Sequence, residues 1–174
     1  MRRIQFLLPV FVILHSCSMH IAPLKGTYPK TPIVYTSEKS LDKIWDNIID
    51  MFAQKGLSIK IIDKSSGLIV SEKSRLSWSL EKKDGSLFDS TNYVVLEKVS
   101  AKGSKYFYTP TRVTGEWNVR IKADGKLTYI NINLTNIMAT YGSAYYSNGR
   151  IVEPVEIVGR TTGVFEKSIY EMIK

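Results

Sequence analysis

The side chains best suited to chemistry are scarce in this sequence and lie near its N-terminus. There is one cysteine, Cys17, and the two histidines are His15 and His20. A Ser-His-Asp or Cys-His arrangement needs a histidine that the fold places beside a nucleophile. A structural zinc site needs about four ligands, chiefly His and Cys. Neither arrangement can be assembled from these residues, so we expect no metal and no cofactor.

Carboxylates are the remaining candidates for catalysis. Glu153 and Glu156 stand close together in the sequence. A glycosidase, however, needs two carboxylates that face each other across a cleft, and sequence spacing does not provide this. Gly142 and Gly149 do not have the spacing of a phosphate-binding loop. We therefore predict a non-catalytic protein and keep a hydrolase that uses carboxylates alone as an alternative.

Residues 1–17 have the layout of an export signal. Arg2 and Arg3 give a positive start, residues 4–14 form an apolar run, and Cys17 follows shortly after it. The run is shorter than the ~20 residues that a membrane-spanning helix needs. A cleaved signal is therefore predicted rather than a permanent transmembrane helix.

The segment Leu14-His15-Ser16-Cys17 resembles the lipobox of bacterial lipoproteins. Leu14 lies three positions before the cysteine and the small residue Ser16 directly precedes it, although His15 stands where the family has a small or apolar residue. The resemblance implies cleavage between Ser16 and Cys17, and a lipid on Cys17 that anchors the mature protein in an envelope membrane. Ser18 follows, rather than an aspartate, and in enteric bacteria this directs a lipoprotein to the outer membrane, where it faces the periplasm.

The charge of the chain is mildly basic. The formal net charge is +8, and two of the positive residues belong to the predicted signal. The remaining lysines are spread along the chain and are expected to be mostly solvated, with contact to anionic lipid, glycan or phosphate as the alternative. No nucleic-acid partner is expected, because export would separate the protein from nucleic acid.

The mature chain is expected to consist of a flexible tether, residues 18–32, and a single α+β domain, residues 33–174. Prolines and a glycine interrupt the tether, and no apolar period appears in it. Ser37 is a candidate N-cap for a helix that runs to about Lys55, where Gly56 can end it. Six apolar residues have helical spacing and share one side of this helix, which favours core packing over a docking face. They are Leu41, Ile44, Trp45, Ile48, Ile49 and Phe52.

Alternating apolar residues predict several strands after this helix. The predicted strands are 33–36, 57–63, 68–73, 75–80, 93–99 and 151–158, the last with Pro154 suited only to an edge or a bulge. A loop is expected at 82–92. A hairpin is expected between Trp117 and Leu134 with Asp124-Gly125 at its turn, and residues 138–150 are expected to form an exposed loop.

A second amphipathic helix is predicted at the C-terminus. Thr161 or Thr162 is the expected cap, and Glu166 lies in the first turn, where its charge suits the helix dipole. One face of this helix carries Phe165, Ile169, Met172 and Ile173. The simplest packing for all these elements is a curved antiparallel sheet with two amphipathic helices on one face.

Two aromatic groups are candidate binding loops. One contains Tyr106, Phe107 and Tyr108, and the other contains Tyr141, Tyr145 and Tyr146. Basic residues near them in the sequence are Lys102, Lys105, Arg112 and Arg150. Such loops suit a glycan or another protein, and ordinary strand and loop aromatics are the alternative.

A short motif in the predicted polar loop is a candidate modification site. Asp89-Ser90-Thr91 resembles the O-glycosylation motif of envelope proteins from the Bacteroides group, which would make Ser90 the acceptor. A three-residue match is frequent by chance. An intact mass without hexose increments would remove this hypothesis.

The stretch from Leu41 to Lys73 resembles the start of a helix-grip domain. It has an amphipathic helix that carries Trp45, then Gly56 and an alternating strand, then a turn at Gly67 and a second strand. The C-component lipoprotein of the β-barrel assembly machinery contains domains of this kind. The resemblance implies an accessory role in an outer-membrane complex, with another envelope protein as partner. A lipid-anchored module for glycan or lipid is the alternative.

Overall fold

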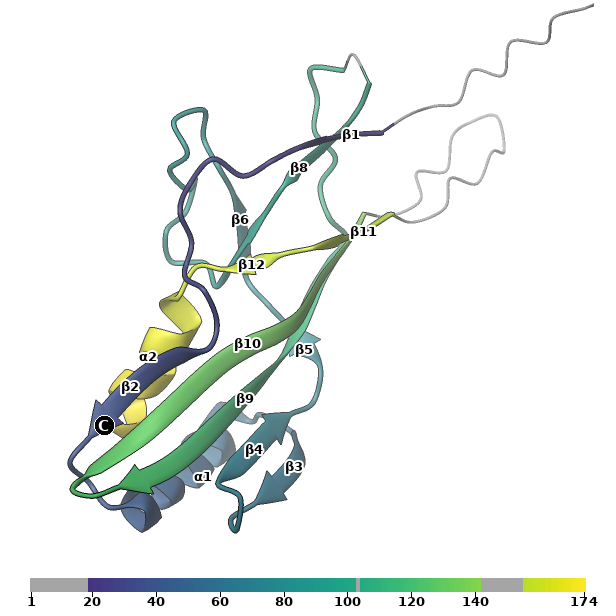
Figure 1. Cartoon of the computed structure of the whole chain (residues 1–174). Coiled ribbons are helices and arrows are strands. Elements are labelled where there is room, and N and C mark those ends of the chain that lie inside the picture. Colours follow the sequence, from purple (N-terminus) through teal and green to yellow (C-terminus); the bar gives the residue numbers. More distant parts are fainter. Residues whose placement is uncertain (1–18, 103, 142–154) are drawn as a thin grey trace, which may run out of the picture.

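The computed structural model describes residues 19–102, 104–141 and 155–174, which form an α+β structure (Figure 1). The helices are α1 (Leu41–Lys55) and α2 (Val164–Ile173). The strands are β1 (Met19–Ala22), β2 (Ile33–Ser37), β3 (Ile59–Asp63), β4 (Leu68–Ser71), β5 (Ser74–Arg75), β6 (Trp78–Leu80), β7 (Val94–Leu96), β8 (Lys98–Ala101), β9 (Arg112–Asp124), β10 (Leu127–Tyr141), β11 (Val155–Val158) and β12 (Arg160–Thr161).

The largest sheet is built around the long β9–β10 hairpin. Its strand order is β11-β10-β9-β4-β3, with β2 added to β10 and β5 added to β9, and all of these pairs are antiparallel. Two small sheets, β12-β7-β6 and β1-β8, lie at the other end of the molecule (Figure 1). The predicted α+β class is confirmed, and the strands are mostly antiparallel. The single sheet that was expected is divided into three, β6 pairs with β7 in parallel, and the described strands form no closed barrel.

Both helices cover the same face of the large sheet. Trp117 of β9 is fully buried, and its ring centroid lies 4.2 Å from that of Phe52 on α1 and 5.6 Å from that of Phe165 on α2. Asn47 of α1 also donates a hydrogen bond to the carbonyl of Ile173 at 2.8 Å. One indole thus joins sheet and helices, and burial of such apolar surface is the main force that holds this region together.

Helix α1 begins three residues later than a cap at Ser37 would require. Ser37 pairs with Thr128 and stays in β2, so its backbone is extended. Ser40 is the N-cap instead, and its side chain accepts a hydrogen bond from the N–H of Lys43. Gly56 ends the helix at φ +61°, as its position predicted. The buried residues of the helix, Ile44, Trp45, Ile48, Met51 and Phe52, confirm core packing.

Helix α2 also differs from the prediction at its start. Its N-cap is Gly163, at φ +85°, and neither Thr161 nor Thr162 is the capping residue. The Thr161 hydroxyl accepts from the N–H of Gly163 and donates to Glu166, so it joins the loop to the first turn. Phe165, Ile169 and Ile173 are buried as expected, whereas Met172 is 40% exposed, because it lies at the edge of the apolar face.

The hairpin is longer than predicted because β10 contains a bulge. Asn136 has φ +50°, and the register with β9 shifts between Thr135 and Met138. The extra residue moves the buried positions from even numbers up to Leu134 to odd numbers from Ile137 onwards. The alternation of buried and partly exposed residues therefore shifts by one position near Asn136, although the strand continues to Tyr141. The loop expected at 138–150 is wrong for 138–141, and its other residues lie outside the described part.

The segment expected to be a tether is packed on the domain from Met19 onwards. β1 pairs with β8, from Met19 opposite Ala101 to Ala22 opposite Lys98. Residues 23–32, called the N-terminal strap below, continue along the small sheets toward β2 (Figure 1). Pro and Gly interrupt regular structure here, but they do not prevent hydrogen bonds to a distant acceptor, Glu81.

Other boundaries shift by a few residues. The predicted strand at 93–99 is divided into β7 and β8, and the one at 75–80 is reduced to the ends that form β5 and β6. Residues 82–92 contain no named strand, as the loop prediction required. β11 lies at the edge of the large sheet. Pro154 lies outside the described residues.

Candidate functional site

A hollow lined by described residues lies where β10 changes neighbours. β2 pairs with β10 up to Ile132, and β11 pairs with it from Met138 onwards. Between these two partners, Leu134 to Ile137 line a groove whose volume is about 690 Å³. The other two walls are the strap residues Gly26 to Thr31 and the segment from Val158 to Thr161. We call this hollow the strap groove.

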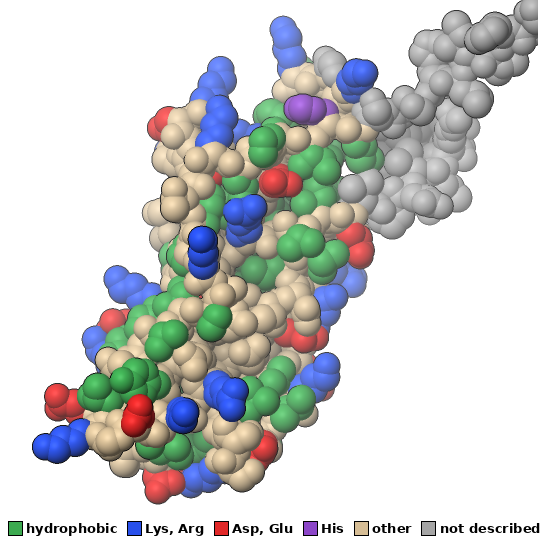
Figure 2. Space-filling model, in the orientation of Figure 1, with side chains coloured by type: hydrophobic (Ala, Val, Ile, Leu, Met, Phe, Trp, Pro, Cys, Tyr) green, Lys and Arg blue, Asp and Glu red, His purple; other side chains and the backbone are tan. Residues whose placement is uncertain are grey.

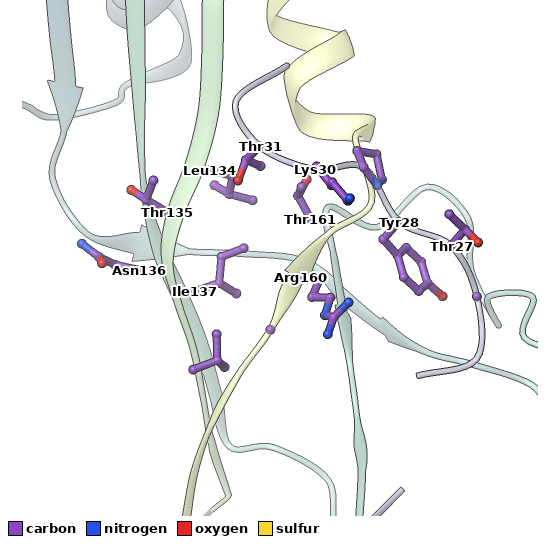
Figure 3. A pocket seen from close by; sticks show the side chains of 14 residues that line it. Thr27, Tyr28, Lys30, Thr31, Leu134, Thr135, Asn136, Ile137, Arg160 and Thr161 are labelled. Atoms are coloured by element: carbon purple, nitrogen blue, oxygen red, sulfur yellow. The ribbon is translucent and has the colours of Figure 1, made fainter. Parts of the chain in front are cut away.

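Figure 3 shows how the strap groove is assembled. Leu134 and Ile137 extend from β10 toward β12 and the strap, whereas Thr135 and Asn136 extend from the opposite side of the strand. The bulge produces this arrangement, because one extra residue at Asn136 returns the chain to the same face. Asn136 donates a hydrogen bond to Glu116 at 2.9 Å, so its amide is held on the far side of the strand.

The chemical character of the strap groove is cationic and rich in hydroxyl groups. Lys30 and Arg160 are both exposed and stand on two different walls. Thr27 and Thr31 add hydroxyl groups, and none of the lining residues is acidic. Such a surface suits an anionic or hydroxyl-rich occupant, because the charges are complementary and the hydroxyls can both donate and accept.

A buried carboxylate fixes the strap wall. Glu81 is 5% exposed and accepts hydrogen bonds from the N–H groups of Lys25 and Gly26, both at 2.8 Å, and from the Tyr28 hydroxyl at 2.6 Å. We call these three contacts the Glu81 clasp. Burial favours a higher pKa for Glu81, but the clasp and the nearby charge of Lys98 outweigh burial and hold the pKa below the usual 4.5. The same burial and the Glu81 charge raise the pKa of Tyr28, so its hydroxyl remains a donor.

A second buried carboxylate lies on α2, beside Thr161 of the groove wall. Glu166 is fully buried, and its Oε2 accepts a hydrogen bond from the Thr161 hydroxyl at 2.8 Å. Its Oε1 has no hydrogen-bond partner among the described residues. Burial raises the pKa of Glu166 above 4.5, against the opposing effect of the hydrogen bonds. Its position in the first turn is as predicted, but burial, rather than the helix dipole, dominates its ionisation.

Two comparisons with known proteins give no relative from which a role for this groove could be taken. No family model matches the chain, and no curated protein matches it either. Within the described ranges, no helix is long and apolar enough to cross a membrane. Nor do three or more His, Cys, Asp or Glu side chains come together there in a way that could hold a metal ion.

The predicted tyrosine loops are only partly described, and one of their members is buried. Tyr106 is 86% exposed, whereas Tyr108 is half-buried and packs against the core. Tyr141 was expected in an exposed loop, but it is 3% exposed at the end of β10 and donates a hydrogen bond to the carbonyl of Glu97. Burial and the Glu97 charge raise the pKa of Tyr141 to about 12. Tyr141 is therefore a core residue and not a binding residue.

Several candidate residues lie outside the described part of the chain. These are Ser16, Cys17, Tyr145, Tyr146, Glu153 and Arg150. Glu156 is exposed on β11. Ser90 is exposed in a turn where the Asp89 carboxylate accepts hydrogen bonds from the N–H and hydroxyl of Thr91. The O-glycosylation of Ser90 stays a prediction.

A basic and aromatic cluster near β1 was not predicted from the sequence. The Lys98 ammonium lies 5.2 Å from the ring centroid of Phe107 and 5.7 Å from that of Phe88. Lys25 approaches from the strap and donates a hydrogen bond to the carbonyl of Lys83 at 3.2 Å. The cluster, called the proximal patch below, consists of Lys25, Lys82, Lys83, Phe88, Lys98 and Phe107. Of these residues, Phe107 belongs to a predicted aromatic group. The residues come from four separate segments, which explains why no sequence motif marked the cluster as a whole.

Proposed function

We propose that this chain is a non-catalytic lipoprotein of a bacterial envelope, anchored through Cys17, that binds another envelope protein in the strap groove. The signal-like residues 1–17 and their lipobox support the anchor. β1 begins at Met19, two residues after Cys17, so the anchor joins the folded domain almost directly. The outer membrane, on its periplasmic side, is the proposed location.

The observation that carries the binding part of the proposal is the charge of the strap groove. Lys30 and Arg160 border it from two walls, and none of its lining residues is acidic. A segment of a partner protein that presents Asp or Glu would therefore meet two cations without repulsion from the groove. The groove volume of about 690 Å³ suits a few side chains rather than a whole folded element.

The order of elements supports a relationship to helix-grip domains. A strand, β2, precedes α1, and antiparallel strands then lead to α2, which packs beside α1 on the same face. We propose that the domain is a helix-grip variant with two additional small sheets. Such a relationship suits an accessory role like that of the C-component lipoprotein of the β-barrel assembly machinery.

A crosslinked pull-down from detergent-solubilised envelopes tests the proposal. The wild-type protein should show a lipid-sized mass increment and recover one envelope protein in fixed proportion. Cys17→Ala should lack the increment and leave the membrane fraction. Arg160→Glu should keep the lipid but lose the partner, because it reverses a charge at the groove, whereas the matched control Lys122→Glu, on the exposed face of β9, should retain it.

The same experiment separates the proposal from its nearest rival. The hydroxyls of Thr27 and Thr31 beside two cations also suit an acidic glycan or a lipid headgroup. A lipidated wild-type protein that recovers no protein partner, but that binds an acidic glycan in a manner abolished by Arg160→Glu, would replace protein binding by glycan binding. Equal recovery of the same protein by Arg160→Glu and Lys122→Glu would remove the strap groove from the proposal.

A further inference from the structure

The position of β1 brings one end of the molecule close to the proposed lipid. Two residues of extended chain span about 7 Å, which is the reach between Cys17 and the start of β1 at Met19. β1 is fixed to β8 by four paired residues, so it cannot move away from the domain while this pairing lasts. The surface around β1 and β8 must therefore lie near the membrane if Cys17 carries an anchor.

The proximal patch lies on this surface. Phe107 pairs with Ser100 of β8 in an isolated bridge, and Lys98 belongs to β8 itself. A shallow hollow of about 160 Å³ connects the patch to β1, because its lining includes Ala22 together with Lys98 and Phe107. Figure 2 shows Lys and Arg side chains that project from the end of the molecule formed by β1, β8 and their neighbours.

The aromatic members of the patch are unusually accessible. Phe88 is 65% exposed and Phe107 is 49% exposed, and the adjacent Tyr106 is exposed as well. Aromatic rings prefer the interface between lipid headgroups and acyl chains, where one part of the ring is in an apolar environment and lysines reach the phosphates. Lys98 brings a positive charge and aromatic rings together, because its ammonium lies near the rings of both Phe88 and Phe107.

The charge balance of the patch favours an anionic surface. The sequence contains no acidic residue before Glu38 and none from Lys98 to Tyr108. Glu81 lines the hollow, but its carboxylate is buried and already holds the Glu81 clasp. Asp84 is exposed nearby and offsets one lysine, while it accepts hydrogen bonds from Ser86. The exposed lysines of the patch therefore lie at the end of the domain that the anchor would bring to the membrane, where anionic lipid would attract them.

We propose that the proximal patch lies flat on anionic phospholipid headgroups and so orients the anchored domain on the membrane. This inference rests on the proposed function, because the lipid on Cys17 brings the patch to the surface. Lysines supply the electrostatic attraction, and Phe88 and Phe107 insert at headgroup level. β3 and the turn between β9 and β10 point away from the bilayer, because they lie at the opposite end (Figure 1).

A depth measurement on the lipidated chain tests the orientation. Once Cys17 is lipidated it has no free thiol, so Tyr106→Cys or Ile62→Cys supplies one reactive site in each variant, near the patch or on the exposed face of β3. Each variant is labelled with a small fluorophore and reconstituted into vesicles that carry a nitroxide quencher at headgroup level. One set of vesicles contains phosphatidylcholine and phosphatidylglycerol in equal parts, and the other contains phosphatidylcholine alone.

The expected result is several-fold stronger quenching of the label at position 106 than at position 62 in the anionic vesicles. Neutral vesicles, or Lys82→Gln with Lys83→Gln, should reduce the difference strongly. The matched pair Lys122→Gln with Lys126→Gln, at the opposite end, should leave it unchanged. Equal quenching at both positions in a protein whose mass proves lipidation would overturn the orientation alone, whereas a mass without lipid would overturn the anchor itself.

Discussion

Glu81 and Glu166 are both buried, yet they belong to two regions that are stabilised in different ways. Glu81 lies among the small sheets, where three donors from the strap and a nearby lysine favour its charged form. Glu166 belongs to α2, where it is fully buried and accepts a hydrogen bond from one hydroxyl, that of Thr161. The pKa of the first carboxyl is lowered and that of the second is raised.

The two ends of the molecule are therefore stabilised by different kinds of interaction. The helix-covered region depends on buried side chains such as Trp117, Phe52 and Phe165, whose packing does not change with pH. The small sheets have short strands, and the strap is fixed to them by polar contacts to one charge. We therefore expect the helix-covered region to set the global stability and the Glu81 clasp to set a local, pH-dependent opening.

Trp117→Ala should destabilise the helix-covered region more than any substitution described below. Removal of a fully buried indole that contacts both helices should lower the free energy of unfolding by about 3–5 kcal/mol. Phe107→Ala, in the proximal patch, should change it by less than about 0.5 kcal/mol because the ring is half exposed. Denaturant unfolding followed by far-UV circular dichroism measures both.

Trp117→Phe is the control for packing at this position. It keeps an aromatic ring between α1 and α2 and removes an indole N–H that has no hydrogen-bond partner among the described residues. It should therefore cost much less than Trp117→Ala. Similar losses for both variants would mean that the indole nitrogen, and not the apolar volume, determines the effect.

Glu81→Gln should release the strap while the helix-covered region remains folded. Loss of charge-assisted hydrogen bonds to Lys25, Gly26 and Tyr28 should lower the free energy of local opening by roughly 1.5–3 kcal/mol. Hydrogen exchange at the amides of Lys25 and Gly26 should accelerate, and exchange in β9 should not. Asp84→Asn, which affects only its own turn, is the matched control.

The same opening should follow from acid alone. The folded pKa of Glu81 is below the usual 4.5, so its stabilisation is complete above that value and is lost as the pH falls through the folded pKa. The protection factor of the Lys25 amide, its protection relative to an unstructured chain at the same pH, should thus fall at low pH in the wild type and lose this acid dependence in Glu81→Gln. An acid dependence that persists in the variant would show that another group controls the strap.

Asn136→Val should have a smaller effect at the junction of the two regions. A β-branched residue at φ +50° is strained, and the left-handed conformation costs about 1–2 kcal/mol. Asn136→Gly should be nearly neutral, because glycine accepts this conformation and only the exposed hydrogen bond to Glu116 is lost. Thermal unfolding measures the pair. If valine and glycine behaved alike, the bulge would have rearranged.

Features with a local cause were predictable from the sequence. The apolar period of α1 and Gly56 at its end depend on neighbouring residues only, and so does the turn between β9 and β10. Features decided by distant pairing were not. Ser37 and Ser40 are both suitable caps, and only the pairing of Ser37 with Thr128 across the sheet excludes the first.

The candidate site was missed for the same reason. The strap groove combines three segments that are far apart in the sequence, and the acceptor of the Glu81 clasp is more than fifty residues from its donors. The bulge at Asn136 breaks the alternation that would have marked β10 as one strand, which made Tyr141 look like a loop residue. The anchor at Cys17, in contrast, is encoded by adjacent residues and stays a prediction.

Glu166→Gln should change stability only modestly, but the pH dependence of this change distinguishes the two buried carboxyls. The folded pKa of Glu166 lies above 4.5, so the unfolded chain releases this proton first and stability falls as the pH rises from 4.5 to the folded pKa. The variant cannot ionise and should lose this fall, which is at most about 1.4 kcal/mol per pH unit. Denaturant unfolding at several pH values gives both curves. The difference in the free energy of unfolding between Glu166→Gln and the wild type should grow with pH. Its sign should be opposite to that of the difference for Glu81→Gln, because the fold stabilises Glu81 as an anion and Glu166 as a neutral acid.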